Sequence, residues 1–477
     1  MSIFNKNNIL IFLFGLSATL FSQTNTFTTA DEIDLLLKDS FFQRCQIAVD
    51  AYDLSAKEII YRHNKKMLMR PASNMKILTT AAALYFLGED YTFKTIIAHD
   101  GEIDDSILVG DLYFIGGFDP DFTTEDLDTM IIELKESGVS KIEGNIYSDV
   151  SKMDSLYWGN GWMWDDDPST DFPYMTPLPI NDAAIKVIVN PSKMGDKPKV
   201  SFLPNLFSPN FVNDAVMVEG DSSKLSVTRD WLNNSDEILI SGDIGLDSEP
   251  DTMEINLSNT NHYFLSLTKE SLKRHGITVQ GTCDTKSTPA DIKRLVVHER
   301  PYEEVIINLN KESDNLSAEM TLRAIAYKYY GKSTSAKKGV MIIDSLITIV
   351  GLDPEDYRLV DGSGVSHYNL VSVELLNEVL KYFYFKEEKL YQILYNSFPI
   401  GGVDGTLKSR MEDFPLFENV HAKTGTLSGV SSLAGYLTAI NGHLISFAIN
   451  TQNFVGSAKT ARFYQDKICE ILAGIDD

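Results

Sequence analysis

The chain has 477 residues, a formal net charge of −25, 43% hydrophobic residues and 23% charged residues. This length exceeds what one hydrophobic core holds, so we expect two or more domains, and the acidic balance disfavours binding to the phosphate backbone of nucleic acids. The cysteines Cys45, Cys283 and Cys469 form no CxxC pair and the histidines form no HExxH pair, so the sequence predicts neither a metal site nor a cofactor.

The first segment is typical of an export signal. Residues 9–21 are mostly apolar but too few to span a bilayer comfortably, and the polar pair Ser22–Gln23 follows. We therefore predict a signal peptide over residues 1–22 and an exported protein of the periplasm or cell envelope. An uncleaved anchor or a buried strand is the alternative. No later segment holds about 18 consecutive apolar residues, so we expect no integral membrane segment after cleavage.

After this segment the sequence predicts a hairpin and a buried helix. Residues 46–53 alternate apolar and polar positions, and residues 57–63 follow after a short turn, as in a β-hairpin. The nearly apolar run 77–87 lies between Pro71 and Gly88. Proline near the start and glycine after the end are typical of a helix. This helix should be buried on most sides.

The middle of the chain differs from its flanks in its predicted secondary structure. We predict strands over 112–115 and 142–148 and a helix over 124–137, and residues 183–280 read as further short strands between turns rich in Asn, Ser, Asp and Pro. Longer helices return from Leu295 onward, over residues 316–330, 338–350 and 373–385.

The last part of the chain predicts strands over 423–427, 430–439 and 444–451, followed by a helix over 458–473. Together with the first hairpin, these strands indicate one antiparallel sheet built from both ends of the chain. The middle of the chain would then be an insertion.

Three short motifs carry the chemistry. They are Ser73–Asn74–Met75–Lys76 at the start of the buried helix, Ser313–Asp314–Asn315 before a later helix, and Lys423–Thr424–Gly425 on a strand. This ordered combination is the signature of penicillin-binding proteins and class A β-lactamases. SxxK alone is a weak signal, since it recurs at Ser266–Lys269 and Ser335–Lys338, whereas KTG occurs once.

The first motif predicts a nucleophile and its base. Ser73 and Lys76 project from one helix face about a turn apart. A serine hydroxyl is a weak nucleophile until a nearby base takes its proton, and a lysine is such a base only if its pKa falls. Burial and a second cation, for which Lys423 is the candidate, would both lower the pKa of Lys76.

The other two motifs predict a proton relay and a substrate cradle. Ser313 can pass a proton to the leaving amine, and Asn315 can hold Lys76 or a substrate amide. Lys423 and Thr424 can bind a terminal carboxylate, and Gly425 lets a substrate approach the strand backbone closely. The backbone N–H groups of Ser73 and Thr426 would form the oxyanion hole.

The wider sequence resembles the class C low-molecular-mass penicillin-binding proteins, a D-alanyl-D-alanine carboxypeptidase/endopeptidase family. The resemblance covers nearly the whole mature chain and includes the stretches Asp361–Ser366, Gly402–Leu407, Ala422–Leu427 and Gly116–Pro120. It implies an α/β (α+β) penicillin-binding/β-lactamase-like transpeptidase domain, with an antiparallel sheet flanked by helices. It also implies two smaller domains inserted between the SxxK and SDN motifs.

The resemblance and the change in composition along the chain imply three domains. We predict the penicillin-binding domain over residues 23–90 and 289–477, an inserted domain II over 91–118 and 172–288, and an inserted domain III over 119–171.

The resemblance implies a serine peptidase that acts on peptidoglycan stem peptides through an acyl-enzyme on Ser73, with β-lactams as covalent inhibitors. A serine β-lactamase is the first alternative, although no carboxylate stands out for its fast deacylation. A catalytically inactive peptidoglycan-binding scaffold is the second. The sequence leaves open the balance of carboxypeptidase and endopeptidase activity, the third stem residue, the oligomeric state and any membrane association.

One loop and one arginine carry secondary hypotheses. The loop of residues 158–171 is rich in Trp and Asp. If it covers the cleft, Asp165 and Asp166 could bind the ammonium group of a diamino-acid side chain, whereas an ordinary acidic surface loop is the alternative. Arg410 could meet a carboxylate, with structural pairing as the default.

Overall fold

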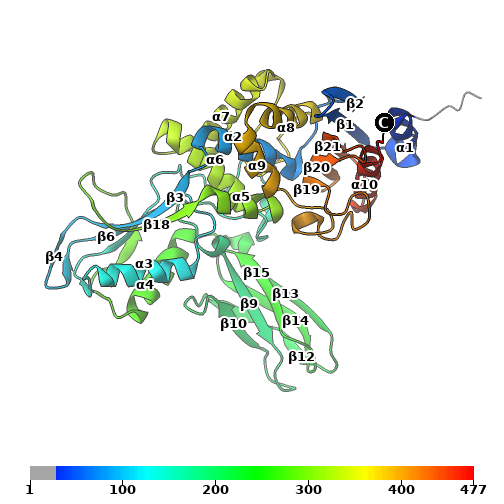
Figure 1. Ribbon diagram of the computed structural model, residues 1–477. Coiled ribbons are helices and arrows are strands. Elements are labelled where there is room, and N and C mark those ends of the chain that lie inside the picture. The colour runs from blue at the N-terminus through cyan, green and yellow to red at the C-terminus, as the bar shows by residue number, and fades with distance from the viewer. Residues whose placement is uncertain (1–27, 477) are drawn as a thin grey trace, which may run out of the picture.

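A five-stranded antiparallel sheet joins the two ends of the chain in the computed structural model, which describes residues 28–476 (Figure 1). The predicted signal peptide of residues 1–22 lies outside the described residues. The strand order is β19-β20-β21-β1-β2, and every neighbouring pair is antiparallel. The prediction of one sheet built from both chain ends is confirmed, with strands β1 (Gln46–Asp53), β2 (Glu58–His63), β19 (His421–Leu427), β20 (Val430–Thr438) and β21 (Leu444–Gln452).

Alternate residues of these strands enter two different apolar clusters, because successive side chains of a strand point to opposite faces. In β1, Ala48 belongs to the cluster around α2, whereas Ile47 and Val49 pack on the other face with residues of α10. Helices therefore cover both faces of the sheet (Figure 1). The helices of this part of the molecule are α1 (Thr29–Leu36), α2 (Met75–Leu87), α5 (Tyr302–Lys311), α6 (Asn315–Tyr330), α7 (Ala336–Ile349), α8 (Val373–Lys386), α9 (Glu388–Ser397) and α10 (Lys459–Ala473).

Helix α2 is the central helix, as its apolar sequence predicts. All but two of its residues, Tyr85 and Phe86, are buried, and Gly88 ends the helix with φ of +96°. A non-glycine residue is disfavoured at such a φ. The helix packs against α6, α7 and α8, so the segment that carries the first motif is held rigidly in the core.

A second five-stranded sheet lies in the inserted region. Its order is β17-β8-β6-β3-β18, and a smaller sheet of order β16-β7-β5-β4 accompanies it. Helices α3 (Thr124–Glu136) and α4 (Thr260–Arg274) pack against each other beside these sheets (Figure 1). The strands are β3 (Thr92–His99), β4 (Glu102–Asp104), β5 (Ile107–Val109), β6 (Leu112–Ile115), β7 (Lys141–Ile142), β8 (Ile146–Asp149), β16 (Thr278–Val279), β17 (Cys283–Thr285) and β18 (Lys293–Pro301).

Two further sheets lie at the bottom of Figure 1. One has the order β10-β9-β15, and the other has the order β11-β14-β12 with β13 paired to β14. Apolar residues of both sheets, such as Val187 and Ile240, share one buried cluster. The strands are β9 (Ala184–Asn190), β10 (Lys199–Leu203), β11 (Phe211–Asn213), β12 (Val216–Val218), β13 (Ser223–Arg229), β14 (Ile238–Gly245) and β15 (Asp251–Asn256).

Helix α4 corrects the expectation that residues 183–280 contain only short strands. Its buried residues Tyr263, Phe264 and Leu267 recur with helical spacing, and the Asn259 side chain caps its first turn by accepting a hydrogen bond from His262 N. Many turn residues precede α4, and they led to the prediction of short strands in place of this helical spacing.

The strand pairing suggests a different division of the insertion. Strand β6, in the predicted domain II, pairs in parallel with β8, in the predicted domain III. We therefore propose one inserted unit formed by residues 91–150 and 260–301, and another formed by residues 184–256. Within residues 28–476 no helix has the length and apolar character needed to cross a membrane.

Candidate active site

Ser73 lies in a short 3-10 turn, η2 (Ala72–Asn74), that leads directly into α2. The Lys76 side chain of the first helical turn reaches back, so that its Nζ lies 3.2 Å from Ser73 Oγ. The same Nζ donates hydrogen bonds of 2.6 Å to Asn315 Oδ1 and of 2.9 Å to the backbone carbonyl of Ser363. Because Lys76 is fully buried, these three oxygens fix its amine beside the serine.

The second motif enters the site at the start of α6. Asp314 caps this helix, Asn315 holds Lys76, and Ser313 lines the same pocket as Ser73. Ser313 has φ of +64°, and Ala72, directly before Ser73, has φ of +48°. Left-handed backbone is uncommon outside glycine and clusters at functional sites, so the site holds two strained residues next to its hydroxyl groups.

A buried loop at residues 361–366 presents the carbonyl that accepts from Lys76. Glu319 of α6 accepts hydrogen bonds of 2.9 Å from the backbone N–H groups of Gly362 and Ser363. The buried carboxylate of Asp361 accepts four more, from Gly364 N, Ser366 N, Asn369 Nδ2 and Trp162 Nε1. These two carboxylates hold the loop, and through it the orientation of the lysine.

Strand β19 forms the opposite side of the site and carries the third motif. Lys423 is fully buried, and its Nζ donates a hydrogen bond of 3.0 Å to the carbonyl of Thr424. Thr424, Gly425 and Thr426 line the pocket, whereas Lys423 does not. The side chains that reach the pocket from this strand are therefore those of Thr424, in the motif, and Thr426, just after it.

Gly425 brings the strand close to the turn that carries the serine. A Cβ atom at this position would lie 2.3 Å from Ser432 Oγ and 2.9 Å from both Pro71 O and Ser73 N. Such distances are far below van der Waals contact. The absence of a side chain here therefore makes room for the backbone of Ser73, and the predicted close approach of a substrate to the strand stays a prediction.

Burial governs the charges of the two lysines. It lowers the pKa of Lys76 to about 8, against the opposing pull of Asp314 and other carboxylates. Burial, and then the charge of Lys76, hold the pKa of Lys423 well below its ordinary range. Of the two causes predicted for the low pKa of Lys76, burial is the one that lowers it, and Lys423 is not among the groups that shift it.

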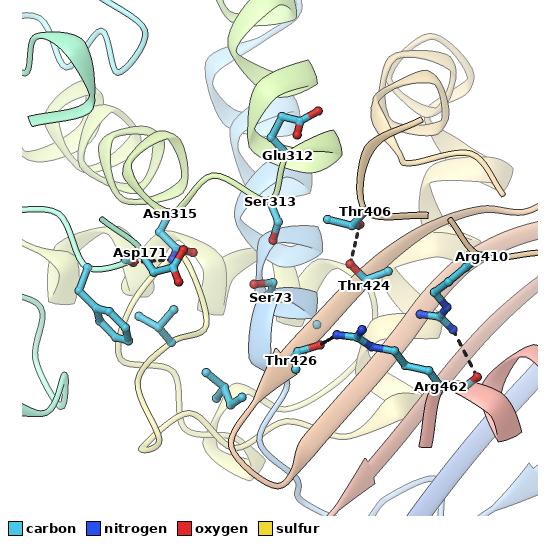
Figure 2. Close-up of a pocket in the computed structure, with 14 residues that line it drawn as sticks. Ser73, Asp171, Glu312, Ser313, Asn315, Thr406, Arg410, Thr424, Thr426 and Arg462 are labelled. Carbon is cyan, nitrogen blue, oxygen red and sulfur yellow. Dashed lines mark hydrogen bonds between the residues drawn. The ribbon is translucent and has the colours of Figure 1, made fainter. Parts of the chain in front are cut away.

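The pocket between these elements has a volume of about 430 Å³. Figure 2 shows Ser73 and Ser313 in its middle, Asn315 and Asp171 to one side, and Thr424 and Thr426 to the other. The sequence motifs of SxxK, SDN and KTG thus meet around one pocket although Lys76 and Asn315 are 239 positions apart.

Two arginines in the pocket wall differ in their partners. Arg410 donates to Asp466 at 2.5 Å and to Gln465 at 3.2 Å, the structural pairing expected for it by default. Arg462, which belongs to none of the predicted motifs, donates a hydrogen bond of 3.1 Å to Thr426 Oγ1 and lines the pocket (Figure 2). Burial and the charge of Arg410 lower the pKa of Arg462, so an anion in the pocket would relieve this repulsion.

The Trp- and Asp-rich loop reaches the site, but through a different carboxylate than predicted. Asp171 lines the pocket, and its backbone carbonyl accepts a 2.6 Å hydrogen bond from Asn315 Nδ2. Asp165 and Asp166 are not among the lining residues, and Asp166 instead accepts from Met163 N at 2.7 Å. Among residues 28–476, no group of three or more His, Cys, Asp or Glu side chains could hold a metal ion.

Comparison with known proteins places this site in a family. The sequence profile described as the D-Ala-D-Ala carboxypeptidase 3 (S13) family matches residues 29–473. A D-alanyl-D-alanine carboxypeptidase of Actinomadura sp. (strain R39) is 30% identical over 459 residues, which cover 93% of this chain and 84% of the relative. The D-alanyl-D-alanine carboxypeptidase DacB of Haemophilus influenzae is 28% identical over 401 residues, which cover 83% of each chain.

Solved structures agree with the sequence relatives. The crystal structure of penicillin binding protein 4 (dacB) from Haemophilus influenzae superposes with a TM-score of 0.82 at 26% identity, and the match covers 93% of this chain and 99% of that one. A structure of the same protein in complex with a novel β-lactam superposes with a TM-score of 0.75 at 26% identity over 92% of this chain and 98% of that one. The predicted fold class, a penicillin-binding domain of mixed α and β structure, is confirmed.

Proposed function

The chain belongs to the D-Ala-D-Ala carboxypeptidase 3 (S13) family, and from that premise we propose that it is a serine-type, penicillin-binding D-Ala-D-Ala carboxypeptidase whose nucleophile is Ser73. The observation that carries the proposal is the contact of 3.2 Å between Ser73 Oγ and a buried lysine amine. Burial lowers the pKa of that amine to about 8, so a usable fraction of it is neutral near pH 7 and can accept a proton.

Acylation starts from neutral Lys76. Its amine keeps its hydrogen bonds to Asn315 and Ser363 and turns its lone pair to the Ser73 hydroxyl. As Ser73 Oγ bonds to the carbonyl carbon of the penultimate D-Ala, the hydroxyl proton passes to Lys76 Nζ. The carbonyl electrons move to oxygen, where the N–H groups of Ser73 and Thr426 would stabilise them; one such donor is worth about 3–4 kcal/mol.

Collapse of this intermediate breaks the peptide C–N bond. The leaving D-Ala nitrogen takes a proton that Lys76 supplies through the hydroxyl of Ser313, which lines the pocket with Ser73. Ser73 is left as an ester. Water then attacks the ester, gives up a proton to the same relay, and frees the shortened peptide as Ser73 regains its hydroxyl.

The anion-binding side of the pocket suits the terminal carboxylate of the substrate. Thr424 and Thr426 offer hydroxyl groups, and Arg462 offers a guanidinium that lies against Thr426. Arginine pairs well with carboxylates. We assign the carboxylate to this trio, because Lys423 is buried beneath the pocket.

The cellular setting is part of the proposal. The substrates would be peptidoglycan stem peptides, with terminal D-Ala removed and cross-links cut as a second activity, and β-lactams would acylate Ser73. The predicted signal peptide would place the enzyme in the periplasm or cell envelope, beside this polymer. Asp171, which lines the pocket, is our candidate to meet an ammonium group on the third stem residue.

The two alternatives receive less support. A serine β-lactamase would turn over penicillin rapidly, but the relatives that cover most of this chain are named carboxypeptidases. An inactive scaffold would not need a lysine with a lowered pKa in contact with Ser73.

A fluorescent penicillin tests the nucleophile. We expect stable labelling of the purified protein and none of the Ser73→Ala variant; equal labelling of both would overturn the assignment. Mass spectrometry of muropeptides after digestion then separates loss of terminal D-Ala from cutting of cross-links. Rapid release of hydrolysed penicillin would instead favour the β-lactamase.

A further inference from the structure

All four tryptophans of the chain gather at one place. Trp158, Trp164 and Trp231 line a surface pocket of about 350 Å³ together with Tyr174 and Leu232. Trp164 and Leu232 are each 71% exposed. Large apolar side chains left this open in a shared hollow mark a binding surface rather than a core.

Two separate parts of the chain build this aromatic pocket. Trp158 and Trp164 come from the loop beside the active site, and Trp231 comes from the turn after β13. The rings of Trp164 and Trp231 lie 5.2 Å apart, and those of Trp158 and Tyr174 lie 4.9 Å apart. The pocket therefore presents several aromatic faces to one ligand.

The charges at the pocket favour a neutral ligand. Asp167 is the one acidic residue among the described residues that line it, and it is paired with the fully buried Arg229. The Arg229 guanidinium also lies 5.3 Å from the centre of the Tyr174 ring. A cationic ligand would find no free carboxylate among these lining residues and would meet an arginine already in place.

The aromatic pocket shares a wall with the catalytic pocket. Phe172 lines the catalytic pocket, and its ring stacks on that of Trp158 at 6.2 Å. Trp162 makes an edge contact with Trp158 at 5.4 Å and donates a hydrogen bond to Asp361 behind the catalytic lysine. A polymer whose peptide enters the catalytic pocket can therefore lay an adjoining part on the tryptophans.

We propose that this aromatic pocket is a subsite for the glycan strand of the substrate. A pyranose ring offers a face of C–H groups with positive partial charge, which suits the negative face of an aromatic ring. Its hydroxyl and acetamido groups are neutral and remain able to bond to water or to Asn234 at the rim. This inference rests on the proposed function, because it assumes that the peptide in the catalytic pocket is joined to a glycan.

Binding is tested without catalysis. Ser73→Ala protein is titrated with a β-1,4-linked N-acetylglucosamine trisaccharide, which has no peptide, while tryptophan fluorescence is followed. We expect a saturable change that Trp164→Ala and Trp231→Ala each weaken about tenfold. Phe211→Ala, an exposed aromatic of the same region outside the pocket, is the matched control and should leave binding intact. No saturable change, or a response to tetramethylammonium alone, would overturn the proposal.

Catalysis gives the second readout. We expect kcat/KM for a disaccharide-bearing pentapeptide, divided by kcat/KM for the free pentapeptide, to fall about tenfold in Trp164→Ala and Trp231→Ala. An unchanged ratio would overturn the glycan subsite while leaving the peptidase in place. Failure of the wild-type protein to cleave either peptide would instead overturn the proposed function, and the trisaccharide titration would still decide the subsite.

Discussion

The backbone carbonyl of Ser363 accepts a hydrogen bond of 2.9 Å from Lys76 Nζ, although the two residues are 287 positions apart. Asp361 and Glu319 fix the loop that presents this carbonyl. The proposed base is therefore oriented by a segment that contributes no side chain to the chemistry, and this relationship makes the loop a target for mutation.

Replacing Asp361 with alanine should damage both stability and acylation. The buried carboxylate accepts four hydrogen bonds, so its loss leaves several buried donors unpaired at a cost of about 3 kcal/mol. Urea unfolding measures the stability, and the acylation rate with a fluorescent penicillin measures the site. Asp356→Ala, an exposed carboxylate in the preceding turn, should change stability by less than about 0.5 kcal/mol. Equal effects of the two substitutions would contradict this role of Asp361.

The acylation rate should depend on pH through Lys76. Burial lowers the pKa of its amine to about 8, and only the neutral amine accepts a proton, so the rate should rise about tenfold per pH unit below that value and level off above it. Stopped-flow acylation of the protein between pH 6 and 9.5 checks the profile. Lys76→Arg keeps the charge but cannot lose it near neutral pH, and should slow acylation at least about 100-fold at every pH. A flat profile for the wild type would contradict the assignment of Lys76 as base.

Gly425→Ala should displace the nucleophile. The added Cβ would meet Pro71 O and Ser73 N at 2.9 Å, so the strand or the turn must move, at a cost of about 1–3 kcal/mol. We expect a lower Tm and slower acylation by penicillin. Gly474→Ala is the matched control, because its nearest contacts, at 3.3 Å and 3.5 Å, are ordinary helical carbonyls, and it should leave acylation unchanged. Normal acylation by Gly425→Ala would show that the tight approach of β19 to Ser73 is dispensable.

Arg462→Gln should weaken recognition of the terminal carboxylate. Arg462 lies beside Thr426 in the pocket wall, and a charged hydrogen bond of this kind is worth about 1.5–3 kcal/mol. The measurement compares kcat/KM for a D-Ala-D-Ala peptide with that for its C-terminal amide. We expect the preference for the acid to shrink about tenfold or more. Arg410→Gln provides the comparison, since Arg410 is already paired with Asp466; a larger loss of preference there would reassign the carboxylate to Arg410.

Much of the catalytic domain follows from local sequence. The alternation in β1 and the Pro and Gly around α2 placed these elements within two residues of their observed bounds. The competing SxxK matches also have structural explanations. Ser266 lies in the middle of α4 with Lys269 exposed, and Ser335 is the N-cap of α7, where its Oγ accepts from Lys338 N.

The missed features depend on contacts between distant segments. The carbonyl of Ser363 and the carboxylate of Asp171 reach the site because of loop packing, which no local period encodes. Arg462 lies on α10, whose amphipathic pattern predicts a helix but not which residue of its polar side faces the pocket. The pairing of β6 with β8 joins strands from two different predicted domains, and it likewise depends on contacts between distant segments.

The strand order β19-β20-β21-β1-β2 has a consequence for the growing polypeptide. Synthesis delivers Ser73 and Lys76 early, but the strand that flanks them and the neighbour that anchors β1 are among the last segments to emerge. A chain that ends before β19 thus carries Ser73 and Lys76 without the strand that forms the opposite side of the pocket. The strand order therefore links completion of the pocket around Ser73 to the synthesis of residues 421–452, which form β19, β20 and β21.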